Sequence, residues 1–238
     1  MESEDIRLLV VDDEVDLCRS IGNYFEIFGY QTKTVNGGQE ALDILAQESF
    51  QLVITDIHMP KVDGVELLEK IKAKDVHIPK VLVISGDADL PVEELYNKGA
   101  DGFFSKPFNS RGMLEAVCKA TVPVEELWKQ APSIEPEHEL TFSCDYPCKG
   151  IAFGRGGLSV AHDRALWGVD DMIRLQIKLN GTELPEIYGA GMVRWKNIYG
   201  QSGHQGSGIE ITYLEESCRA EFSKWLIDLP GPAYIPIL

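Results

Sequence analysis

The chain has 238 residues, 44% hydrophobic and 25% charged, which is the composition of a folded globular protein and enough length for two ordinary domains. Its formal net charge of −16, from 22 basic and 38 acidic residues, excludes nucleic acid and anionic membranes as favoured partners unless the chain has a local basic patch, which we do not find. No apolar run approaches the ~20 residues of a membrane span and the start, MESEDIR, has no signal-peptide character, so we expect a cytoplasmic protein without membrane insertion.

The first half of the chain alternates between short apolar runs and segments with helical periodicity. The runs predict strands, of which the second is more polar and is expected near a sheet edge, and each strand is followed by an amphipathic helix. Five such units with short connections predict a doubly wound, five-stranded parallel sheet with helices on both faces, occupying residues 1–122. The predicted strands are 6–12, 30–36, 51–56, 80–86 and 102–108, and the predicted helices are 14–29, 37–48, 64–74, 91–99 and 110–120.

The pattern changes after Pro123. Residues 123–137 contain several prolines and acids without sustained periodicity, and we interpret them as a linker. Residues 138–238 show strands punctuated by glycine and predict a small six-stranded all-β barrel or sandwich, flanked by an amphipathic helix over 215–229. The predicted strands are 140–146, 149–154, 157–163, 171–180, 186–199 and 206–214.

Acidic, hydroxyl and ammonium groups follow the predicted strands of the first half. Asp12 and Asp13 end the first strand, Asp56 the third and Ser85 the fourth, and Lys106 follows the fifth. The carboxyl ends of parallel strands meet at one edge of the sheet, where open α/β sheets bind their ligands. Clustered carboxylates predict a divalent cation such as Mg²⁺, and a lysine with a serine suits a phosphoryl group. The alternative is that these carboxylates only cap helices.

The strings VVDDE, LVITDIHMPKVDG, VISGDA and FFSKPF, in this order on these strands, resemble the receiver domain of two-component response regulators over residues 1–121. The resemblance implies phosphorylation by a histidine kinase or phosphotransfer protein, with Mg²⁺ as the cofactor. The roles it implies are Asp56 as phosphoacceptor; Asp12, Asp13, Asp56 and the backbone carbonyl of His58 as metal ligands; Ser85 and Lys106 as phosphoryl contacts; and Phe103 as the switch aromatic that changes rotamer with Ser85.

The strings RGGLSV, MVRW and GSGIEI, with the terminal helix, resemble a PilZ domain over roughly residues 138–229. PilZ domains commonly bind cyclic di-GMP through an R-x-x-x-R element and a [D/N]-x-S-x-x-G element. Residues 132–146 contain no arginine, and Ala152 and Gly154 replace the acid and the serine of the second element, so only Gly157 matches. Two bound phosphates need cationic partners. The sequence therefore predicts a degenerate PilZ-like domain, with Arg155 and Gly157 as the remaining candidates for nucleotide contact.

These observations together predict a response regulator and not an enzyme, because we find no nucleophile–base–acid set in the second half. We expect the PilZ-like domain to act on an unknown protein target or by dimer rearrangement, with a homodimer through the face of residues 91–119. One alternative is a cyclic di-GMP receptor that uses non-standard residues such as Arg155 and Arg194. A DNA-binding helix-turn-helix output would show helices and basic charge after the linker, whereas the sequence there shows strands and acidic residues.

The five cysteines lack an even framework and a C-x-x-C pair, and we expect small buried thiols.

Overall fold

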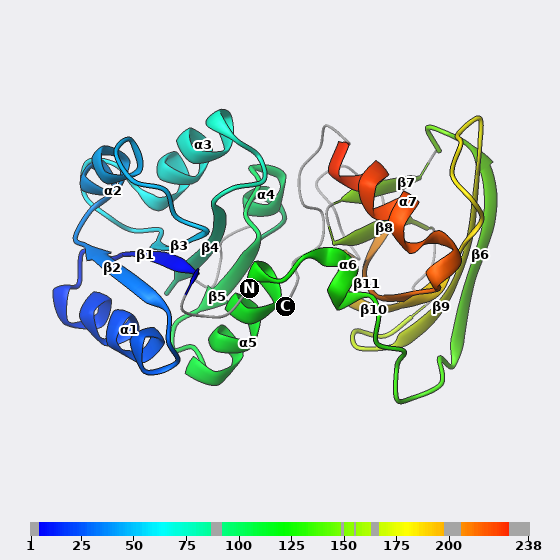
Figure 1. Cartoon of the computed structure of the whole chain (residues 1–238), viewed down its shortest axis with the longest axis horizontal. Coiled ribbons are helices and arrows are strands. Elements are labelled where there is room, and N and C mark those ends of the chain that lie inside the picture. Colours follow the sequence, from blue (N-terminus) through cyan, green and yellow to red (C-terminus); the bar gives the residue numbers. More distant parts are fainter. Residues whose placement is uncertain are drawn as a thin grey trace. The chain divides into compact units, whose positions relative to one another are not determined.

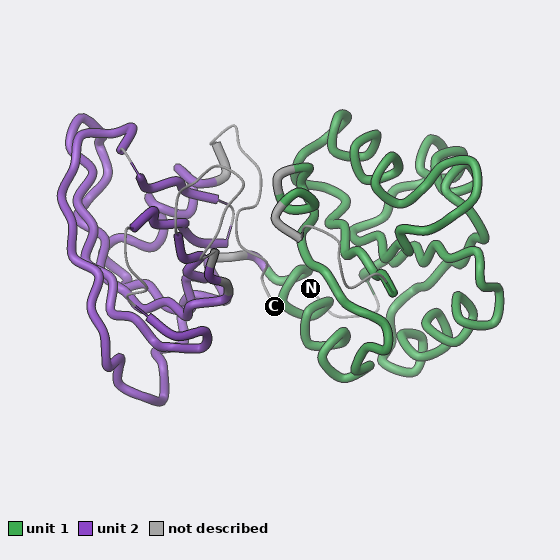
Figure 2. Tube along the Cα trace, turned by 180° about the vertical axis from the view of Figure 1, so that it is seen from behind, with its two compact units in different colours: residues 1–122, 237–238 green, residues 123–236 purple. Residues whose placement is uncertain are grey.

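The computed structural model describes residues 5–86, 92–148, 150–154, 156–162, 167–197 and 206–228. The chain divides into two compact units, one of residues 1–122 with 237–238 and one of residues 123–236 (Figure 2). No helix among the described residues is long and apolar enough to cross a membrane.

Unit 1 is a five-stranded parallel sheet with helices on both faces (Figure 1). The strand order β2-β1-β3-β4-β5 confirms the predicted sheet and places the polar second strand at an edge. The strands are β1 (Arg7–Val11), β2 (Gln31–Val35), β3 (Leu52–Asp56), β4 (Lys80–Ser85) and β5 (Gly102–Ser105). The helices are α1 (Val15–Ile27), α2 (Gly38–Leu45), α3 (Gly64–Lys74), α4 (Val92–Asn97) and α5 (Ser110–Thr121).

Side-chain alternation along the central strands builds two separate cores. Leu9 and Val53 face the cluster made with α2, α3 and α4, whereas Leu8 and Ile54 face the cluster made with α1 and α5. Both faces of β3 are thus covered, and all five of its residues are buried. Apolar residues on both faces of a strand are the requirement of a parallel sheet between two helical layers, and they hold the carboxyl ends of the strands rigidly.

Unit 2 is a six-stranded mixed sheet in the order β6-β9-β10-β11-β8-β7 with one helix packed against it (Figure 1). Within the described residues β6 and β7 are edge strands that do not pair with each other, so the sheet is a half-barrel, where we expected a closed barrel or a sandwich. The elements are α6 (Val124–Leu127), β6 (His138–Asp145), β7 (Ile151–Gly154), β8 (Gly157–Ala161), β9 (Met172–Asn180), β10 (Ile187–Asn197), β11 (Gly206–Leu214) and α7 (Glu216–Asp228).

Helix α7 and a tryptophan from the expected linker complete the core of unit 2. Cys218, Phe222 and Leu226, which lie on the predicted apolar stripe, are buried against the sheet. Trp128, within the segment that we interpreted as a linker, is 2% exposed, and its carbonyl accepts a hydrogen bond from the N–H of Leu214 (3.0 Å). The predicted helical residue Leu229 lies outside the described residues.

One expectation about the cysteines was wrong. Cys144 and Cys148 form a disulfide, while Cys18, Cys118 and Cys218 are free thiols, of which Cys118 is exposed. Both partners belong to unit 2: Cys144 is on β6, and the chain turns after this strand so that the Cα atoms of the two cysteines, four residues apart, lie 5.9 Å from each other. That separation lies within the range that a disulfide spans, and spacing in the sequence alone does not reveal it.

Candidate functional site

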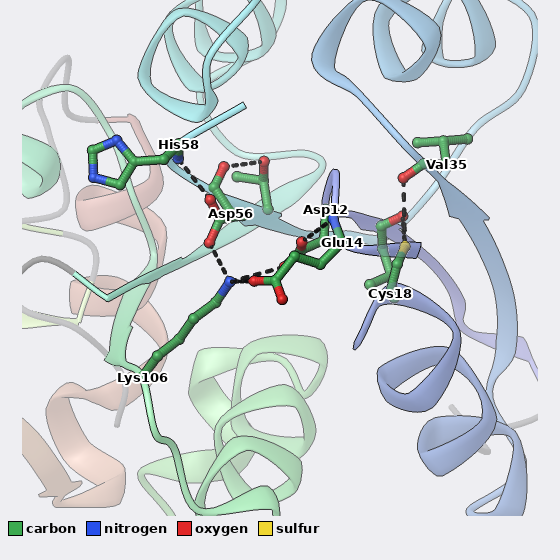
Figure 3. Close-up of polar contacts among 9 residues, drawn as sticks. Asp12, Glu14, Cys18, Val35, Asp56, His58 and Lys106 are labelled. Atoms are coloured by element: carbon green, nitrogen blue, oxygen red, sulfur yellow. Dashed lines mark hydrogen bonds and ion pairs between the residues drawn. The ribbon is translucent and has the colours of Figure 1, made fainter. Parts of the chain in front are cut away.

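The carboxyl ends of the strands of unit 1 carry the candidate site (Figure 3). Asp12 directly follows β1 and Asp56 is the last residue of β3, and these two strands are neighbours in the sheet. Lys106 follows β5, and its backbone N–H donates to the carbonyl oxygen of Ser85 at the end of β4 (2.7 Å). Four strands therefore deliver their polar residues to one edge, because parallel strands all end on the same side.

The ammonium group of Lys106 contacts three carboxylates at this edge of the sheet. Its Nζ lies 2.7 Å from Oδ1 of Asp56, 3.1 Å from Oδ2 of Asp12 and 3.5 Å from Oε1 of Glu14. Asp12 and Asp56 are buried, at 1% and 4% exposure, whereas Glu14 is exposed. A buried carboxylate loses its hydration, so a charged partner at hydrogen-bond distance is needed to keep it ionised.

The burial of the site changes the proton affinity of its groups. Burial raises the pKa of Asp12, while a hydrogen bond from the N–H of Glu14 (2.8 Å) and the ammonium of Lys106 act in the opposite direction. Burial lowers the pKa of Lys106, but hydrogen bonds to Asp56 and Asp12 outweigh it, and the pKa lies above its ordinary value. Lys106 is therefore a permanent cation at this edge of the sheet.

The backbone around Asp56 fixes the direction of its carboxylate. The N–H of His58 donates to Oδ2 of Asp56 (2.6 Å), and the N–H of Gly64 donates to the carbonyl of Ile57 (2.8 Å). A Cβ on Gly64 would lie only 2.0 Å from the carbonyl oxygen of Asp56, so this position accepts no side chain. Helix α3 begins at Gly64 and thereby packs its first residue directly against the end of β3.

The structure brings some of the predicted residues together and leaves others apart. Asp12, Asp56 and Lys106 meet, and Ser85 is buried at the end of β4. Asp13 is exposed, and among the described residues no three His, Cys, Asp or Glu side chains are grouped closely enough to hold a metal ion. Glu14, which directly follows Asp12 and Asp13 and received no predicted role, also faces Lys106 (3.5 Å).

Phe103, the predicted switch aromatic, lies on β5. It is half-buried and packs against the core made with α2, α3 and α4. Phe103 also lines a surface pocket of about 450 Å³ between β5 and α5, together with Phe104, Pro107, Phe108, Gly112 and Lys119. The ring is thus placed between the interior and a surface, which is where a change of rotamer would alter that surface.

Of the two nucleotide candidates of unit 2, only Gly157 belongs to the described residues. Gly157 is buried at the start of β8, where it pairs with Gly154 and with Glu210 of β11. Arg155 lies outside the described residues. Arg194, which the cyclic di-GMP alternative also uses, donates from Nε to Oε2 of Glu210 at 2.5 Å, and Glu210 is 4% exposed.

Two polar pairs in unit 2 were not foreseen. The Arg194–Glu210 ion pair joins β10 to β11, and Nη1 of Arg194 also lies 3.5 Å from Oδ1 of Asp170. Nε2 of His162 lies 2.8 Å from Oγ of Ser207, but the serine is fully buried and so has no access to a substrate. The partners are 16 residues apart in the first pair and 45 residues apart in the second, so no local motif predicts them.

Comparisons with known proteins extend over unit 1. Residues 8–118 match the model of the response regulator receiver domain. The transcriptional regulatory protein CpxR homolog of Haemophilus influenzae is 34% identical over 111 residues, which are 47% of this chain and 48% of that protein. The response regulator protein FleR of Pseudomonas aeruginosa is 33% identical over 114 residues, 48% of this chain and 24% of that protein.

A solved CheY-like receiver domain from Methanospirillum hungatei is 32% identical and covers 49% of this chain and 93% of that one, with a TM-score of 0.46. The chain spans about half the length, or less, of the curated relatives named above. The matched residues contain all the strand ends that meet at Lys106. Residues 8–118 of this chain are a response regulator receiver domain of the two-component type.

Proposed function

We propose that the protein is a two-component response regulator that accepts a phosphoryl group on Asp56 from a histidine kinase or a phosphotransfer protein in the cytoplasm. The observation that carries this proposal is the position of Lys106, whose Nζ contacts Asp56 at 2.7 Å and Asp12 at 3.1 Å. A carboxylate that is buried, oriented and faced by a fixed cation is equipped to receive a phosphoryl group.

In the proposed reaction a carboxylate oxygen of Asp56 forms a bond to phosphorus as the bond from phosphorus to the donor histidine nitrogen breaks. The N–H of His58 orients the nucleophile through Oδ2. The ammonium of Lys106 stabilises the negative charge of the transferred oxygens, and the hydroxyl of Ser85 is proposed as a second contact. Positioning and electrostatics carry such a transfer, so no general base is required.

The donor set at this edge fits Mg²⁺. Asp12 and Asp56 supply hard carboxylate oxygens, Asp13 follows Asp12 in the chain, and the backbone carbonyl of His58 is two residues from Asp56. When bound, Mg²⁺ would neutralise charge as the anionic phosphoryl group approaches the carboxylates. Asp12 and Asp56 would hold the cation, and Lys106 contacts both carboxylates in this structure.

We further propose that unit 2 is a PilZ-like output domain that acts by protein interaction or dimer rearrangement and that performs no catalysis. The pairing of Arg194 with buried Glu210 supports this, because a guanidinium engaged by a carboxylate is a poor phosphate ligand. The face of residues 91–119, which includes Phe103, is the proposed dimer surface.

The test of the phosphoacceptor is labelling by acetyl phosphate with Mg²⁺. Wild-type protein should gain one acid-labile phosphoryl group, and Asp56→Asn should gain none. Asp43→Asn is the matched control, since Asp43 is exposed on α2 outside the site and its loss should leave labelling unchanged. Persistent labelling of Asp56→Asn would move the acceptor to another residue and overturn the proposal.

The test of the output is calorimetric titration with cyclic di-GMP, together with solution mass measurements with and without beryllium fluoride. We expect no binding at low-micromolar nucleotide and a change in mass or shape with the phosphoryl mimic. Low-micromolar binding would favour the nucleotide-receptor alternative.

A further inference from the structure

The disulfide of unit 2 closes a very short loop. Cys144 is near the end of β6, and Cys148 follows it after only Asp145, Tyr146 and Pro147. Constraint of the unfolded chain grows with the number of residues in the closed loop, so a ring of this size adds little stability compared with a long one. Its existence is poorly explained by stability alone.

The two sulfur-bearing residues are also accessible. Cys144 and Cys148 are half-buried, and the three residues between them are exposed. Two of the remaining cysteines, Cys18 and Cys218, are buried instead, and burial raises the pKa of both thiols, which suppresses the reactive thiolate. Figure 3 shows the Cys18 thiol directed at the carbonyl oxygen of Val35 in the interior of unit 1.

The closed loop holds one aromatic ring against α7. The ring of Tyr146 meets that of Trp225 edge to face, with 5.1 Å between centroids. Trp225 in turn stacks on Phe222 (5.7 Å) and contacts Phe153 of β7 edge to face (5.3 Å). Phe222 is fully buried in the core of unit 2. A chain of ring contacts therefore connects the disulfide loop to the helix and to the core, against which Cys144 and Cys148 also pack.

We propose that Cys144 and Cys148 form a reversible redox site that controls how firmly the 145–147 loop holds α7. The proposal rests on the cytoplasmic role proposed above, because disulfides in reducing compartments are usually transient and catalytic or redox-sensing. The reductant is a thiol or dithiol, either glutathione or a small redox protein. Its thiolate attacks one sulfur and breaks the Cys144–Cys148 bond through a mixed disulfide.

A second thiol of the reductant then resolves the mixed disulfide. The products are two protein thiols and one oxidised reductant, so two electrons and two protons pass to the protein. The reverse exchange with an oxidised thiol partner restores the bond. Reduction removes the covalent closure of the 145–147 loop, so that the Tyr146 ring can separate from Trp225, although the N–H of Tyr146 still donates to the carbonyl of Asn180 (3.1 Å).

The first experiment equilibrates the full chain with glutathione buffers of increasing reduced-to-oxidised ratio, followed by acid quenching, alkylation and mass mapping of all five cysteines. We expect Cys144 and Cys148 to change together, with a midpoint inside the cytosolic range of glutathione ratios, while Cys18 and Cys218 stay reduced. A pair that stays oxidised in the most reducing buffer is structural, and a pair that stays reduced in the most oxidising buffer is not a disulfide; either result would overturn the proposal. Labelling by acetyl phosphate, done on a portion of each sample before quenching, tests the proposed phosphorylation of Asp56 independently of the cysteines.

The second experiment measures amide hydrogen exchange of α7 in the oxidised and reduced wild-type protein. We expect exchange to rise roughly two- to ten-fold on reduction, as for the loss of an aromatic contact. Tyr146→Ala keeps both cysteines and should raise exchange in α7 even when oxidised. Cys118→Ser is the matched control, because Cys118 is exposed on α5 of unit 1 and should leave both states of α7 unchanged. Equal exchange in the two redox states would contradict control of α7 by the loop.

Discussion

Replacing Gly64 by alanine tests whether the end of β3 holds Asp56 in place. The added Cβ would lie 2.0 Å from the carbonyl oxygen of Asp56 and 2.9 Å from its carbonyl carbon. Contacts of a Cβ with other atoms essentially never fall below 3.0 Å, so backbone must separate from backbone by about 1 Å. The contact involves no flexible side chain that could move aside cheaply.

The stability cost follows from overpacking. Forcing one extra carbon into a packed position typically costs about 1–3 kcal/mol. With a urea slope of roughly 1–3 kcal/mol per molar for a domain of this size, the unfolding midpoint of unit 1 should fall by on the order of 1 M. Fluorescence or circular dichroism during urea titration measures this shift.

The functional cost follows from the same displacement. The N–H of Gly64 donates a hydrogen bond to the carbonyl of Ile57, the residue after Asp56. A shift of α3 would therefore also shift Asp56, which carries the nucleophile. A misplacement of about 1 Å can slow a positioned reaction by roughly 100-fold. The rate of phosphorylation by acetyl phosphate should fall by about this factor under conditions where Gly64→Ala is still folded.

Gly112→Ala is the matched control. Gly112 lies inside α5, and a Cβ there would meet no atom closer than the Cβ of Asn109 at 4.0 Å. Alanine is favoured over glycine by about 0.8–1.0 kcal/mol in a helix interior, and Gly112 lies in the first turn of α5, so this variant should keep or slightly gain stability and keep its phosphorylation rate. If Gly64→Ala matched the wild type in both midpoint and rate, the argument that this close approach positions Asp56 would be refuted.

Asp101→Asn should destabilise unit 1 by about 3–5 kcal/mol in urea unfolding, because it removes the carboxylate that pairs with the buried Lys72 ammonium (2.8 Å) and leaves neutral carbonyl oxygens, such as that of Pro79 (2.9 Å), to solvate the buried charge. A hydrogen bond from Lys33 is the main cause that lowers the pKa of Glu48, so the stabilisation from this carboxylate is present above its ordinary pKa and is lost as pH falls through the lower folded value. The unfolding midpoints of the wild type and Glu48→Gln should therefore differ near pH 7 and converge in acid. Lys106→Met should slow phosphorylation by acetyl phosphate on the order of 100-fold, as expected when a group that stabilises developing charge is removed.

Three comparisons would contradict these expectations. A double variant, Lys72→Met with Asp101→Asn, should recover part of the stability lost by Asp101→Asn; no recovery would mean that the pair does not couple. If the unfolding midpoints of the wild type and Glu48→Gln still differed at low pH, the effect of the substitution would come from the shape of the side chain and not from its charge. Lys98→Met removes a lysine that forms an ion pair with Glu69 outside the site. It should leave the phosphorylation rate unchanged, in contrast to Lys106→Met.

The sequence by itself determined most of unit 1. Apolar runs such as Leu52–Ile54, followed by helical periodicity, require a parallel sheet between two layers of helices. A parallel sheet places every strand end on one edge, so the meeting of Asp12, Asp56 and Lys106 could be predicted from the order of elements alone. The six strands and the terminal helix of unit 2 could also be predicted, because alternation and the helical stripe are local signals.

Only the tertiary structure decided the features that depend on pairing between distant segments. The absence of β6–β7 pairing among the described residues, the burial of Trp128 in unit 2 and the Arg194–Glu210 ion pair all depend on how the elements of unit 2 pack together. The contact of Gly64 with Asp56 depends on how closely α3 approaches β3. The Cys144–Cys148 bond depends on how the chain turns at the end of β6. Periodicity specifies which face of an element is buried, whereas the partner against which it is buried is fixed only when the whole domain packs.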